Sequence, residues 1–95
     1  MSDVIAAAVE ALSGKLSDGF DGIAKFVIED EGAIMVDGDG VRAADDDAEV
    51  TLTASADVFQ SILSGDLDAT SAFMSGQLSV DGDMGAAMRL GSALS

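Results

Sequence analysis

Apolar residues at the start of the chain recur every three or four positions, which predicts an amphipathic helix. Ser2 suits its N-cap, and Asp3 lies in the first turn, where a carboxylate is favourable at the positive helix end. Gly14 is a weak point near the other end, and residues 17–19 and 21–22 are typical of a loop. The expected apolar stripe consists of Val4, Ile5, Ala8, Val9, Leu12 and Leu16.

From residue 23 to residue 30 the pattern changes to alternation, with Ala24, Phe26 and Ile28 on one face, which predicts a strand. Residues 50–54 alternate in the same way and predict a further strand with one polar face. Between the two we expect a turn at 31–32, a strand at 33–36, a turn at 37–40, a strand at 41–44 and a solvated connection at 45–47.

Helical spacing returns after Ser55, which is suited to cap a second helix that Gly65 ends. Asp68 is suited to cap a short third helix that ends at Gly76, and Asp83 is suited to cap a last one. The apolar positions expected in these elements are Val58, Phe59, Ile62 and Leu63 in the second helix, Ala72, Phe73 and Met74 in the third, Leu78 and Val80 in a short fifth strand, and Met84, Ala87, Met88, Gly91 and Leu94 in the last helix.

The order of these elements predicts an α+β domain with helices on one face of a sheet. The chain has 95 residues, of which 48% are hydrophobic, so we expect one domain spanning residues 1–95 with a packed core.

The charge balance excludes some partners. Four basic and 18 acidic residues give a net charge of −14. Nucleic-acid binding needs clustered cations, and Lys15, Lys25, Arg42 and Arg89 are scattered, so we expect no nucleic-acid partner. An anionic membrane would repel the chain at long range, so strong docking there is not expected either. The acidity itself is accounted for by solubility or by adaptation to salt.

The residue types present also limit the chemistry. The sequence contains no His, Cys or Tyr, which removes the usual general base, the thiol nucleophile and the soft metal ligands. Residues 37–40 do not fit an EF-hand loop, and three consecutive carboxylates at 45–47 are typical of a solvated loop, so neither a metal nor a cofactor is expected. A carboxylate pair remains a conceivable catalyst, but the prediction is a protein that is not an enzyme.

Sequence signals for targeting point to no special compartment. The first residues lack the basic region of a secretory signal, and the last residues differ from the peroxisomal address. No apolar run approaches the roughly 20 residues of a membrane span. The expected location is therefore the cytoplasm.

The segment from Gly65 to Asp83 carries a specific motif. A short helix ending in Phe73-Met74 is followed by Gly-x-Leu-x-Val-x-Gly-Asp over residues 76–83, and residues 88–90 continue the pattern. In these features the chain resembles the sterol carrier protein 2 (SCP2) family. The resemblance implies a five-stranded, mostly antiparallel sheet covered on one face by helices. It also implies an apolar tunnel between sheet and helices that binds fatty acids, acyl esters, phospholipids or sterols.

The resemblance and the amphipathic pattern together give a candidate binding site. Met74, Met84 and Met88 fall close together, and Met is common at adaptable apolar surfaces, although ordinary core packing would also explain them. Arg89 is either a head-group contact or an exposed helix residue. The residues expected to line the tunnel are Phe59, Ile62, Leu63, Phe73, Met74, Leu78, Met84, Met88 and Leu94.

Two functions follow from the resemblance. The first is a lipid carrier, whose partner is a lipid or another apolar small molecule. The second is a non-catalytic accessory module, for example in isoprenoid quinone biosynthesis, which would bind a protein partner; a homodimer also stays open. Family members often carry Lys where this chain has Gln77, Ser79 and Asp81, which weakens the case for anionic membranes and CoA phosphates.

Overall fold

The computed structural model describes residues 3–17 and 19–94, and within them the elements follow the expected order. Ser2, the expected first N-cap, lies outside these residues. The elements are α1 (Asp3–Lys15), β1 (Ala24–Ile28), β2 (Gly32–Asp37), β3 (Gly40–Ala43), β4 (Val50–Ala54), α2 (Ala56–Ser64), α3 (Ala69–Met74), β5 (Ser79–Gly82) and α4 (Met84–Leu94).

The strands form one mixed sheet in the order β3-β2-β1-β4-β5. Neighbouring strands are antiparallel except β1 and β4, which are parallel with Ala24 opposite Val50 and Ile28 opposite Ala54. The prediction of an α+β fold with a five-stranded, mostly antiparallel sheet is therefore confirmed. A parallel pair needs a crossover connection, and residues 44–49 complete it between β3 and β4.

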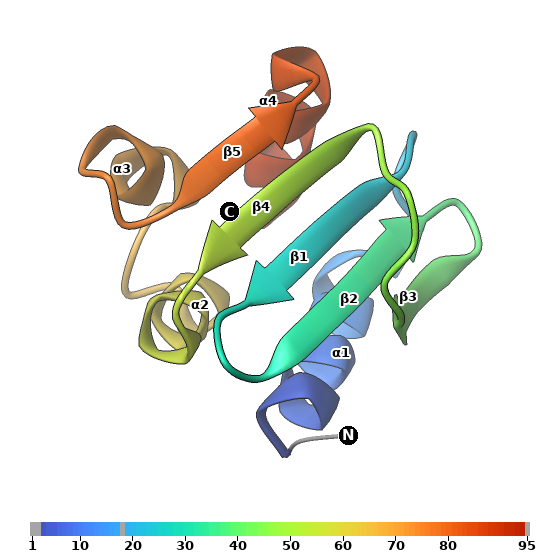
Figure 1. The fold of residues 1–95 in the computed structure, drawn as a ribbon, viewed down its shortest axis with the longest axis horizontal. Helices are drawn as coiled ribbons and strands as arrows, with labels where there is room; N and C mark the ends of the chain where they lie inside the picture. Colours follow the sequence, from blue (N-terminus) through green and yellow to red (C-terminus); the bar gives the residue numbers. More distant parts are fainter. Residues whose placement is uncertain (1–2, 18, 95) are drawn as a thin grey trace.

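The helices cover one face of this sheet (Figure 1). There α1 packs against β2 and β3, and α4 packs against β4 and β5. The alternation in β1 places Ala24, Phe26 and Ile28 in the core beneath them, and the rings of Phe26 and Phe59 meet edge to face at 5.3 Å. The sequence alternation thus correctly identified the inward face of β1.

The connection between β3 and β4 crosses the other face of the sheet. Lys25 on β1 contacts it through an ion pair of 2.8 Å between its Nζ and Asp45 Oδ1. Met35, which lies opposite Lys25 in the register, is buried outside the main core. The acidic connection therefore packs on the sheet at one end and is solvated at Asp46 and Asp47.

The expected caps are confirmed for three helices. Ser55 Oγ accepts a hydrogen bond from Val58 N at 3.3 Å, and Asp68 Oδ1 accepts one from Thr70 N at 3.2 Å. Asp83 Oδ1 accepts from Gly85 N at 2.9 Å at the start of α4.

The fifth strand begins later than the alternation suggests. Leu78 was expected in the strand, but its backbone N–H donates to the carbonyl of Ala72 at 3.1 Å, so it belongs to the turn that follows α3. The strand pairs with β4 from Ser79 onward. Leu78 is buried all the same, because it turns into the core between α3 and the sheet edge.

Candidate functional site

An apolar groove of about 330 Å³ lies between α3, α4 and the β4–β5 edge of the sheet. We call it the α3–α4 groove. Its volume is at the lower end of the range for small-molecule sites, about 300–1,000 Å³. Its lining consists of Leu52, Ala69, Thr70, Phe73, Met74, Leu78, Val80, Met84, Ala87, Met88, Gly91 and Ser92.

The groove has a floor of small or buried residues and a rim of large exposed ones. Leu52 and Leu78 are buried in the floor. At the rim, Phe73 is 41% exposed, Met74 80%, Met84 46% and Met88 73%. A cluster of large, solvent-exposed apolar side chains around a groove is unusual for a folded domain, and such patches commonly mark binding sites.

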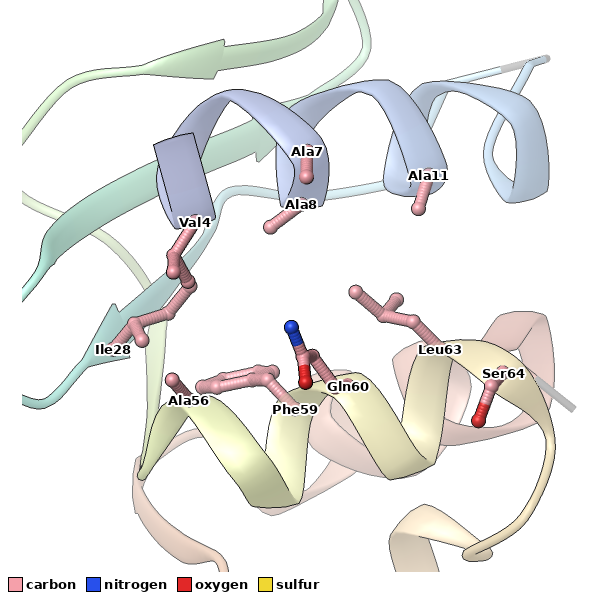
Figure 2. A pocket seen from close by; sticks show the side chains of 10 residues that line it. All are labelled: Val4, Ala7, Ala8, Ala11, Ile28, Ala56, Phe59, Gln60, Leu63 and Ser64. Carbon is pink, nitrogen blue, oxygen red and sulfur yellow. The ribbon is translucent and has the colours of Figure 1, made fainter. Parts of the chain in front are cut away.

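A second apolar groove, of about 360 Å³, separates α1 from α2. We call it the α1–α2 groove. Figure 2 shows the two helices facing one another across it, with the amide of Gln60 projecting into the space between them. The larger side chains at its base, Ile28 and Phe59, are already buried. The rest of its lining consists of Val4, Ala7, Ala8, Ala11, Ala56, Leu63 and Ser64.

The residues expected to line one tunnel are divided between these two grooves. Phe59 and Leu63 line the α1–α2 groove, whereas Ile62 is buried in the core and lines neither. The side chain of Leu94 lies outside what the structure describes. The α3–α4 groove brings together Phe73, Met74, Leu78, Met84 and Met88.

Some lining residues were not among the candidates. Leu52 and Val80 contribute from β4 and β5, and their place in the strand alternation could have identified them as neighbours of the site. Thr70 and Ser92 supply the hydroxyl groups of the lining. No sequence signal distinguished them from other surface hydroxyls, because only the packing of α3 beside α4 brings them to one groove.

Arg89, the candidate head-group contact, is not in the lining of either groove. Its Nη2 donates a hydrogen bond to the backbone carbonyl of Asp21 at 3.3 Å. In the same region Glu49 Oε1 accepts from Ile23 N at 2.7 Å. Arg89 therefore connects α4 to the segment that enters β1.

Among the described residues, the pKa shifts that the structure produces occur away from both grooves. Arg42 on β3 and Asp37 at the end of β2 form an ion pair of 2.8 Å. The hydrogen bond from Arg42 lowers the pKa of the Asp37 carboxyl, helped by a second from the backbone N–H of Asp39. The same pair raises the pKa of Arg42. This electrostatic feature stabilises a β turn and has no contact with the candidate site.

Neither a metal-binding cluster nor a membrane span is found in the part of the chain that the structure describes. Within residues 3–17 and 19–94, no three His, Cys, Asp or Glu side chains are grouped so that they could hold a metal ion. Each helix of the same ranges is too short or too polar to cross a membrane.

The fold and the grooves define a small α+β domain that exposes an apolar hollow at the edge of its sheet. The model of the SCP-2 sterol transfer family matches residues 4–95, so the chain belongs to that family. The resemblance seen in the sequence is confirmed. A search of curated proteins found no significant match.

Several solved structures share the fold. Sterol carrier protein 2 from Aedes aegypti, solved in complex with the C16 fatty acid palmitate, is 23% identical, with a TM-score of 0.79 over 100% of this chain and 97% of that one. The Aedes aegypti sterol carrier protein 2 like 2 is 16% identical, with a TM-score of 0.77 over 94% of each chain. A UbiJ-SCP2 ubiquinone synthesis protein is 18% identical, with a TM-score of 0.67 over 96% and 92%.

Proposed function

We propose that this protein is a single-domain, non-catalytic lipid carrier that binds the apolar part of its ligand in the α3–α4 groove. The observation that carries the proposal is the exposed rim of Phe73, Met74, Met84 and Met88 around an apolar floor. Membership of a sterol transfer family supports lipid as the ligand class. The palmitate complex of the related mosquito protein supports an aliphatic chain as the part that is bound.

The α3–α4 groove is favoured over the α1–α2 groove because occupation would remove more apolar surface from water there. Met74 and Met88 are largely exposed, and burying a Met side chain fully contributes about 1.5–3 kcal/mol. In the α1–α2 groove, Ile28 and Phe59 are already buried and would gain little. Met side chains also adapt their shape, which suits a ligand without a rigid outline.

The groove is open, so the closed tunnel that the family resemblance implies stays a prediction. Closure over a ligand would require α3 and α4 to approach one another or the Met side chains to fold inward. Both changes would exchange water at the rim for contacts with the ligand.

A second function is an accessory module that binds a protein partner, for example in quinone biosynthesis. The similarity to the UbiJ-SCP2 ubiquinone synthesis protein favours it, although at 18% identity the likeness concerns the fold. The same exposed rim would then be a protein contact, or would hold the apolar substrate of the partner.

The first test is to purify the protein natively, extract it with organic solvent and identify bound lipid by mass spectrometry against a mock purification. A near-stoichiometric lipid is the expected result. An empty protein that also fails to displace a fluorescent lipid would overturn the carrier proposal and direct the search to a protein partner.

Paired variants locate the site. Met74→Ser with Met88→Ser removes two exposed side chains, so stability should change by less than about 1 kcal/mol. Lipid affinity should fall by roughly tenfold, because each truncation removes apolar contact. Leu63→Ser removes apolar contact from the α1–α2 groove, at a larger cost in stability because Leu63 is half-buried against the core. If this variant lowers affinity and the Met pair does not, the ligand lies between α1 and α2 instead.

A further inference from the structure

The described lining of the α3–α4 groove offers hydroxyl groups to a ligand but no positive charge. Thr70 and Ser92 line it from α3 and α4. The two helices approach closely here, since a Cβ added at Gly91 would lie 4.0 Å from Thr70 Oγ1. A ligand whose chain contacts the Met rim can therefore reach two hydroxyls that donate or accept hydrogen bonds.

The four basic side chains of the chain are placed elsewhere. Lys25 pairs with Asp45, and Arg42 pairs with Asp37, each at 2.8 Å. Arg89 donates to the carbonyl of Asp21, and Lys15 belongs to the last turn of α1. None of the four is in the described lining of the groove.

The helix N-termini beside the groove are also occupied by the protein itself. A helix N-terminus is a common site for carboxylates and phosphates, because its free N–H groups and dipole favour negative charge. Here Asp68 caps α3 and Asp83 caps α4, with their carboxylates bonded to Thr70 N and to Gly85 N.

From this charge distribution we infer that the groove takes an aliphatic lipid with an uncharged polar end, such as an alcohol or ester, and discriminates against the matching carboxylate. The inference rests on the proposed lipid-binding function. An anionic head would lie near the capping carboxylates of Asp68 and Asp83 within a chain of net charge −14, whereas a hydroxyl or ester carbonyl can bond to Thr70 and Ser92.

The test compares dodecanol with dodecanoate, which share a chain and differ in the charge of the head. Affinities are measured by displacement of an uncharged fluorescent lipid at neutral pH. In about 10 mM salt dodecanol should bind roughly tenfold more tightly, and the ratio should shrink to a fewfold near 100 mM as screening grows. The ratio cancels salt effects on the shared chain.

Variants that change the charge at the groove provide a second test. Ser92→Lys exchanges a hydroxyl of the lining for a cation and should shift the ratio of the two affinities about fivefold toward dodecanoate, whereas Ser92→Gln, which removes the same hydroxyl without adding charge, should not. Asp68→Asn with Asp83→Asn keeps two good N-caps, since Asn replaces Asp well there, and should favour dodecanoate about twofold to threefold. Asp46→Asn with Asp47→Asn makes the same net change on the far connection and should have a smaller effect.

The outcomes separate this inference from the proposed function. If dodecanoate binds the natural protein at least as tightly as dodecanol, or loses affinity as salt rises, the inference is overturned while lipid binding stands. If neither binds and no lipid is extracted from the native protein, the proposed function itself fails and the inference with it.

Discussion

Gly82, the last residue of β5, lies against the backbone where the chain enters β4. A Cβ added there would overlap the backbone carbonyl oxygen of Glu49 and would lie 3.0 Å from the Cα of Val50. The residue also has a φ of +112°, a conformation that side-chain-bearing residues rarely adopt. Gly82→Ala should therefore destabilise the protein for two separable reasons.

The magnitude follows from these two effects. Forcing a side chain into a disfavoured positive φ costs about 1–3 kcal/mol. Pushing a methyl group against fixed backbone adds about 1–3 kcal/mol. The atoms it would meet, the carbonyl oxygen of Glu49 and the Cα of Val50, belong to the backbone and cannot move aside as a flexible side chain could. The expected total, roughly 2–6 kcal/mol, is a large part of the about 5–15 kcal/mol by which domains of this kind are stable.

Gly40 provides the matched control. Its φ is +126°, close to that of Gly82, but an added Cβ would meet nothing within 4 Å. Gly40→Ala should therefore lose only the conformational part, about 1–3 kcal/mol. The free energy of unfolding of both variants is measured by urea denaturation.

The difference between the two variants isolates the close approach at Glu49. A Gly82→Ala protein no less stable than Gly40→Ala would show that β5 can shift away from β4, and the reasoning would be refuted. If the prediction holds, Gly82 fixes the point from which α4 starts, since the next residue, Asp83, donates its N–H to the Glu49 carbonyl at 2.9 Å. The position of one wall of the groove would then depend on this contact.

Two further predictions concern a ligand and a change of pH. Dodecanol at about a hundred times its dissociation constant should add about 2.7 kcal/mol to stability and raise the melting temperature by roughly 10–20 °C, measured by calorimetry; an unchanged Tm at saturation would argue against binding to the folded state. The pKa of Asp37 is lowered in the folded protein. Its ion pair with Arg42 therefore contributes stability above about pH 4, the ordinary carboxyl pKa, and this contribution is lost as the pH falls through the pKa that Asp37 has in the folded state. Arg42→Gln should therefore lower Tm slightly at neutral pH and match the natural protein in acid, and a deficit that persists in acid would contradict this assignment.

Much of the fold could be predicted because local signals and tertiary packing agree. Ser55, Asp68 and Asp83 all cap the helices they were expected to cap, and the alternation in β1 identified its buried face. The residues alone could not predict the parallel pairing of β1 with β4, because alternation has the same period in parallel and antiparallel strands. The start of β5 was misplaced for a similar reason, since the backbone bond from Leu78 to Ala72 leaves no trace in the apolar pattern.

The candidate site was harder to predict, because an amphipathic pattern marks apolar residues without saying whether they fill the core or surround a hollow. Phe59 and Ile62 have the same spacing in α2 as a binding face would have, yet both are buried in the core. Arg89 was a candidate by its place in the motif, but its guanidinium is directed to the Asp21 carbonyl. These positions depend on contacts between segments far apart in the sequence.

The arrangement of α4 explains why a groove exists in a domain with so many apolar residues. An ordinary amphipathic helix turns its large side chains toward the core. In α4 the fully buried positions are Ala86 and Leu90, while Met84 and Met88 remain exposed at the rim. Because Ala86 and the neighbouring Ala87 fill little volume, and Gly91 none beyond its backbone, the helix covers the sheet without filling the space beside α3. The Met side chains that could have filled that space are instead placed where they can fold over whatever enters it.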